Sequence, residues 1–132
     1  MLFKNNHMKK NLFIIENAER RIARYEKEIK IGMDRLQKNF MQSFKWESEQ
    51  LYKNNWNKFE DECMIQVIKD MDLEAVHEFV TKRKNNYISM VLRFSVSRST
   101  SALSNEQSLW ENECYQVRIG LMESIEYFIE SK

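Results

Sequence analysis

Residues 15–36 read IENAERRIARYEKEIKIGMDRL, and the spacing of their apolar side chains decides the fold class. An isoleucine or leucine recurs every seven residues, at Ile15, Ile22, Ile29 and Leu36. At 100° per residue these side chains share one face of a helix, which is the pattern of an amphipathic helix. We predict one helix over about residues 10–45, roughly 50 Å long at 1.5 Å per residue. We expect this seam and Phe40 to be buried, either against later helices of the chain, which we favour, or against a second copy.

The composition of the whole chain also favours helices. The 132 residues contain no proline and only two glycines, so the turn residues that β proteins need are missing. Charged residues make up 31% of the chain, and Glu, Lys, Arg, Met, Leu and Ile are good helix formers. We predict a single all-α domain over residues 1–132. It is expected to be an elongated helical hairpin or a bundle of three to five helices, with one long amphipathic N-terminal helix.

The middle of the chain is expected to form a further helix. Beyond the first helix the sequence either stays helical or breaks near Asn54 and Asn55. Asp70 or Asp72 is a suitable N-cap, because a short acidic side chain accepts a hydrogen bond from a free backbone N–H. The helix that follows is predicted to end near Phe94.

A serine-rich stretch over residues 95–103 is predicted to link this helix to the last one, over 104–130. Ser104, with a glutamine three residues later, fits a capping box. We expect the last helix to bury Val117, Leu121, Ile125 and Phe128. The hydroxyl groups of the linker, together with Arg93 and Arg98, are of the kind that binds an anion. An inert joint is the simpler interpretation.

Charge is unevenly distributed along the chain. Residues 1–58 hold 13 Lys and Arg against 7 Asp and Glu, a net charge of +6, whereas residues 59–132 hold 8 against 13, a net −5. We favour two halves that pack together with complementary charge. A basic surface for an anionic partner is the alternative.

Few residues suit catalysis or metal binding. Cys63 and Cys114 are far apart in the sequence and form no CxxC motif, and the pair Glu74 and His77 is an isolated ExxH. No glycine-rich phosphate loop, GxSxG or HExxH motif is present. We therefore expect no enzyme activity, no metal site and no cofactor. The absence of a long apolar run predicts a cytoplasmic protein with no membrane partner.

Binding to another protein is the function we expect, as an adaptor, an inhibitor or a small subunit of a complex. A homodimer is a subsidiary expectation, and nucleic-acid binding is the alternative. Large aromatic side chains are enriched at protein interfaces. The candidate aromatic interface residues are Trp46, Tyr52, Trp56 and Phe59. The candidate contacts for a partner or for phosphate are Arg20, Arg24, Lys27, Lys38, Arg93 and Arg98.

Overall fold

The protein is built from helices alone over the residues that the computed structural model describes, which are 2–100 and 106–131. Side chains are described for residues 8–95 and 106–131. The elements are α1 (Leu2–Lys38), α2 (Phe40–Ile68), α3 (Leu73–Thr100) and α4 (Glu106–Glu130). The prediction of an all-α fold with a long N-terminal helix is confirmed, since α1 spans roughly 55 Å.

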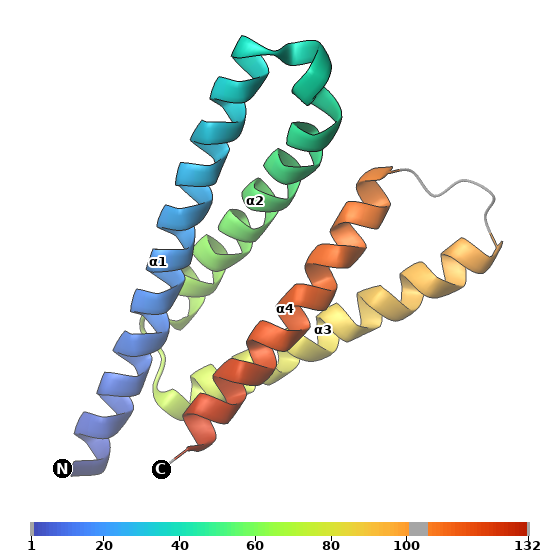
Figure 1. Ribbon diagram of the computed structural model, residues 1–132. Coiled ribbons are helices and arrows are strands. Elements are labelled where there is room, and N and C mark those ends of the chain that lie inside the picture. Colours follow the sequence, from blue (N-terminus) through green and yellow to red (C-terminus); the bar gives the residue numbers. More distant parts are fainter. Residues whose placement is uncertain (1, 101–105, 132) are drawn as a thin grey trace.

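The four helices form two hairpins (Figure 1). Helix α1 packs along α2, and α3 packs along α4. The turn between α1 and α2 lies at one end of the molecule, whereas both chain ends and the turn between α2 and α3 lie at the other. The hairpins pack together near that shared end and splay apart away from it. The turn between α1 and α2 therefore projects from the rest of the molecule.

Helix α1 ends at Lys38, so the predicted helix over residues 10–45 is interrupted. Asn39 leaves the helical conformation, with φ −153° and ψ 60°, and α2 begins at the next residue. The backbone N–H of Asn39 still donates a hydrogen bond to the carbonyl of Arg35 at 2.9 Å. Figure 1 shows the first turns of α2 crossing the end of α1 before the helix runs back along it. The break therefore lies at Asn39, and α2 is continuous through Asn54 and Asn55.

The turn from α2 to α3 is short and held by hydrogen bonds between side chains and the backbone. The predicted cap is confirmed at Asp72, whose Oδ1 accepts a hydrogen bond from the N–H of Ala75 at 2.8 Å. The Nδ2 of Asn11 in α1 donates to the carbonyl of Met71 at 2.9 Å. This contact fixes the start of the second hairpin against the first.

Helix α3 extends to Thr100, so residues 95–100 are helical and the predicted linker over 95–103 is wrong for this part. A serine can satisfy its hydroxyl within a helix by donating to the carbonyl four residues earlier. Ser95 does so, with its Oγ 3.2 Å from the carbonyl of Val91. The predicted N-cap Ser104 and the rest of that linker lie outside the described residues.

The core is formed where the two hairpins meet. The buried apolar cluster consists of Ile14, Ala18, Met64, Ile68, Val76, Val80, Tyr87, Met122 and Ile125. On α1 the buried side is shifted by one residue from the predicted seam: Ile14 is buried and Ile15 is half-buried. Phe40 was expected in the core but is 55% exposed, because it lies beyond the end of α1.

The last helix differs from its prediction by a similar shift. Ile125 is buried, and Leu121 and Phe128 are half-buried, as their spacing indicates. Val117, however, is 67% exposed, and the neighbouring Arg118 is only 1% exposed. Arg118 takes the inward position because the buried carboxylate of Asp61 lies next to its guanidinium.

Candidate functional site

Asp61 is the centre of a buried ionic network between the hairpins. Its carboxylate is inaccessible to solvent and accepts two hydrogen bonds from Arg21, at 3.0 Å from Nε and 2.9 Å from Nη2. Such a two-pronged contact is the strongest geometry for an arginine and a carboxylate. The Nη1 of Arg118 lies 3.0 Å from Oδ1 of the same carboxylate. Asp61 of α2 thus joins α1 to α4.

Glu60 forms a second pair of contacts with α3. Its Oε1 accepts a hydrogen bond from the hydroxyl of Tyr87, and its Oε2 accepts one from Arg83, both at 2.8 Å. The guanidinium of Arg83 also lies over the ring of Tyr87, 5.5 Å from its centroid. Adjacent acids on α2 therefore connect three other helices.

The network has the properties of a structural site. Burial tends to lower the pKa of Arg118, but Asp61 and Tyr87 outweigh this effect and raise the pKa, so Arg118 remains charged. Its Nε has no hydrogen-bond partner among the described residues. The carboxylates of Asp61 and Glu60 are occupied by arginines or a tyrosine. These groups fix how the hairpins pack and leave no free acid or base for catalysis at this position.

Two of the four candidate aromatic residues lie between the hairpins. The ring of Trp56 contacts Tyr115 edge-on, with centroids 5.2 Å apart, and that of Tyr52 lies 5.7 Å from Trp110. Burial, followed by the contact with Glu111, raises the pKa of Tyr115. The structure therefore assigns Tyr52 and Trp56 to internal packing between α2 and α4, which the sequence alone did not distinguish from an external interface.

The other two candidates, Trp46 and Phe59, are exposed but far apart. They are separated by 13 positions on α2, which is roughly 20 Å along a helix. Phe59 borders a shallow hollow of about 500 Å³ on the outer side of α1 and α2, together with Ile22, Cys63 and Val67. The four aromatic candidates thus do not form one surface.

The basic candidates on α1 form an exposed row. Arg20, Arg24, Lys27 and Lys38 lie on one side of the helix at 100° per residue and all are exposed. Arg20 makes a long hydrogen bond of 3.4 Å to Asn17, and the guanidinium of Arg24 lies 5.3 Å from the ring centre of Tyr25.

Arg93 and Arg98, the candidate contacts at the serine-rich stretch, belong to α3 and not to α1. Arg93 is exposed on the outer half of α3, which runs away from α1 (Figure 1). Arg98 is in the last turn of α3, outside the described side chains. The exposed basic row on α1 therefore consists of Arg20, Arg24, Lys27 and Lys38.

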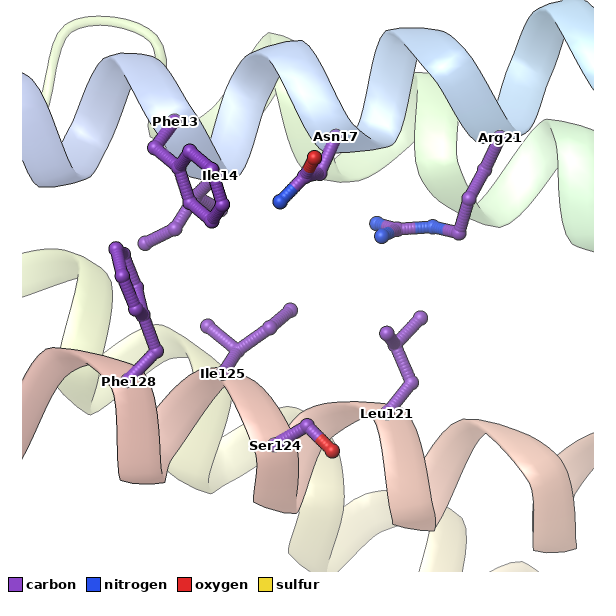
Figure 2. Close-up of a pocket in the computed structure, with 8 residues that line it drawn as sticks. All are labelled: Phe13, Ile14, Asn17, Arg21, Leu121, Ser124, Ile125 and Phe128. Carbon is purple, nitrogen blue, oxygen red and sulfur yellow. The ribbon is translucent and has the colours of Figure 1, made fainter.

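A hollow of about 210 Å³ separates α1 from α4 near the chain ends. Figure 2 shows side chains of the two helices facing each other across it. Phe13 and Phe128 close one end, with ring centroids 4.8 Å apart, while Asn17 and Arg21 supply polar groups from α1. Ser124 of α4 is the third polar residue of the lining, and the rest of the lining is apolar. Arg21 is already bonded to Asp61.

Four exposed apolar side chains gather next to the turn between α1 and α2. Phe40, Met41, Phe44 and Trp46 occupy the first two turns of α2, and we call them the hairpin tip. Met41 is 88% exposed, and the other three are more than half exposed. The rings of Phe40 and Phe44 lie 5.2 Å apart, so they form one apolar surface.

The sequence patterns singled out only Trp46 within the tip. Phe40 was assigned to the buried seam because, four residues after Leu36, it falls on the same face of a continuous helix. The loss of register from Phe44 onward was the signal that this part of the stripe leaves the core. The exposure of Phe40 and Phe44 depends on the break in the helix at Asn39. No proline or glycine near Asn39 marks this break in the sequence.

No arrangement typical of a metal or thiol site is found in the described part of the chain. No group of three or more His, Cys, Asp or Glu side chains lies close enough to hold a metal ion in residues 8–95 and 106–131. Burial raises the pKa of the Cys114 thiol to about 11, which keeps it protonated near neutral pH. The Nε2 of His77 contacts Glu130 at 2.8 Å rather than Glu74. None of the helices, over the residues described, is long and apolar enough to cross a membrane.

Comparison with known proteins finds no match among protein-family models, among curated protein sequences or among solved structures. The functional interpretation therefore depends on the surfaces described above.

Proposed function

We propose that this protein is a non-enzymatic binding or assembly protein of the cytoplasm, such as an adaptor, an inhibitor or a small subunit, and that the hairpin tip contacts its protein partner. The observation that carries this proposal is the exposure of Phe40, Met41, Phe44 and Trp46 on one projecting end.

The tip has the composition of an interface centre. Aromatic residues and methionine are enriched where protein interfaces are fully buried, and a few such side chains supply most of the binding energy. Leaving several of them in water is unfavourable by about 25 cal/mol for each Å² of apolar surface. The three rings contribute little to the core, because each is more than half exposed in the described chain.

The shape of the tip indicates how it binds. It is the convex end of a hairpin, with Lys38 and Lys45 beside the apolar side chains. Neither lysine forms an ion pair with an acid of the described residues. A partner surface that accepts this end would therefore be apolar at its centre and acidic at its edge.

Affinity capture from a cell lysate tests the proposal with matched variants. The wild type is compared with a tip variant, Met41→Glu/Phe44→Glu, and with Leu92→Glu, which alters an exposed apolar residue of α3. We expect the wild type and the Leu92 variant to retain the same proteins and the tip variant to lose them. Retention of the same proteins by all three would contradict the proposal.

Nucleic-acid binding is the second candidate, favoured by the exposed row on α1. Lysine and arginine contact phosphates and release counterions, so the affinity would fall with salt, with a log–log slope of about 0.7–0.9 for each phosphate contacted. Replacing Arg24 and Lys27 by alanine is expected to reduce that slope by about two units if each contacts one phosphate. Binding to single- or double-stranded nucleic acid that does not change with salt would exclude this candidate.

A further inference from the structure

Helix α4 carries an acidic outer face opposite in character to the tip. Residues 106–131 contain six glutamates and a single arginine, and that arginine, Arg118, is buried. Glu106 and Glu123 are exposed and form no ion pair within the described part of the chain. Glu113 pairs with Lys53 of α2, and Glu126 pairs with Lys84 of α3, so part of this negative charge is balanced within the chain. The charges of Glu106 and Glu123 remain available on the outer side of α4.

The same face holds exposed apolar groups around a glycine. Val117, Gly120 and Tyr127 lie on one side of α4, and Tyr127 is more exposed than Val117. Together with Glu113 and Glu123 we call them the α4 face. The hollow between α1 and α4 borders this face at Ser124 (Figure 2).

Among the described residues, no close contact requires a glycine at position 120. A glycine inside a helix costs about 1 kcal/mol relative to alanine. A Cβ atom built at Gly120 would meet no other atom within 4 Å, so no neighbour requires its absence. The glycine leaves bare backbone between Val117 and Tyr127, a notch in which an aromatic ring from outside could lie.

We propose that this protein associates head to tail, with the hairpin tip of one copy docked on the α4 face of another. This inference rests on the proposed function and names the partner of the tip as a second copy of the chain. Charge complementarity selects that occupant: Lys38 and Lys45 beside the tip face Glu123 of the neighbouring copy, which has no ion pair among the described residues, with Glu113, already paired with Lys53, at the edge.

The contact must form between molecules. Figure 1 places the turn between α1 and α2 at the opposite end of the molecule from the C-terminal half of α4. A tip therefore cannot reach Gly120, Glu123 and Tyr127 of its own chain, which lie in that half of α4. The contact is also asymmetric, because each copy offers one tip and one face, so successive copies can join in a row.

The contact is small, so the association is expected to be weak. Sedimentation velocity on the purified full chain, from about 10 μM to about 1 mM, covers dissociation constants typical of small interfaces. The wild type should associate as its concentration rises, and about 0.5 M NaCl should weaken the association, because the charges are exposed and screened. A wild type that remains monomeric throughout would overturn the inference.

Two variants and their mixture test the asymmetry. Met41→Glu/Phe44→Glu removes the tip, and Val117→Lys/Gly120→Gln alters the face, whereas Leu92→Glu serves as the control. Each of the first two should weaken association at least tenfold, which corresponds to about 1.4 kcal/mol, and should keep the helical circular dichroism of the wild type. The control should associate like the wild type.

An equimolar mixture of the tip variant and the face variant tests most directly whether a tip binds a face. The tip variant still has an intact face and the face variant an intact tip, so an equimolar mixture should form 1:1 dimers and no larger species. A mixture that stays monomeric would overturn the asymmetric contact. Self-association of one variant alone would overturn it as well and would indicate tip-to-tip or face-to-face pairing. Failure of this inference is distinguishable from failure of the proposed function, because a monomeric protein whose tip still captures other proteins would contradict only the head-to-tail contact.

Discussion

Asp61 shows why a charged residue can be more important to this core than an apolar one. Its carboxylate lies between Arg21 and Arg118, and the stems of these arginines pass through the interior (Figure 2 shows Arg21 beside the hollow). Taking charges out of water is unfavourable, so such a group contributes to stability only while all its partners are present. Removing the carboxylate of Asp61 would leave the charge of Arg118 buried without a counterion.

Replacing Asp61 by asparagine should therefore destabilise the protein strongly. We expect the free energy of unfolding in urea to fall by about 3–5 kcal/mol, since Arg118 would remain buried without its counterion. Glu78→Gln is the control, because Glu78 forms an exposed pair with Lys82 at 3.0 Å, and its loss should cost less than about 0.5 kcal/mol. Equal effects of the two substitutions would show that the network does not hold the hairpins together.

At the scale of the helix, periodicity made most of the fold predictable. The all-α class, the long first helix, the cap at Asp72 and the inward position of Ile125 follow from spacing and composition. The choice between Val117 and Arg118 does not, because both positions fit the inward side of α4. It depends on Asp61, a residue 57 positions away in the sequence.

The candidate site was only partly predictable for the same reason. The exposed row on α1 follows from its position opposite the seam. Trp56 could not be assigned to the interior, because the sequence does not show which side of α2 the second hairpin covers. Phe40 could not be assigned to the surface, because only the path of the chain beyond Asn39 removes it from the core.

The two glycines provide a prediction about helix packing. A Cβ atom at Gly32 would lie 3.0 Å from Oε2 of Glu47 and 3.3 Å from Cδ2 of Leu51, so α1 and α2 approach closely there. Gly120→Ala should stabilise the protein by about 1 kcal/mol through helix propensity alone. Gly32→Ala should be less stable than Gly120→Ala by about 1–3 kcal/mol because of overpacking. Thermal unfolding of the two variants measures this difference, and equal stabilities would contradict the close approach.

At the scale of the molecule, the interface between the hairpins contains three tyrosines with altered ionisation. Burial is the largest cause that raises the pKa of Tyr52, Tyr87 and Tyr115 above the usual value of 10.0. The folded protein thus holds these phenolic protons more tightly than the unfolded chain. Their contribution to stability is complete below pH 10 and is lost as the pH rises above it.

We therefore expect the free energy of unfolding to fall from about pH 10 upward. Tyr115→Phe should reduce this dependence, because phenylalanine has no proton to lose, and chemical denaturation at a series of pH values measures it. A wild type and a Tyr115→Phe variant with the same pH dependence above pH 10 would contradict the role of this tyrosine.

Site-specific photo-crosslinking at position 41 tests most directly whether the tip binds protein. A photoreactive phenylalanine analogue replaces Met41 in one version of the chain and Leu92 in another, since both side chains are exposed and apolar. Irradiation in cells should give protein adducts from position 41 and few from position 92, with self-adducts mapping to the α4 face. The absence of protein adducts at position 41, or equal yields at both positions, would contradict the proposed function.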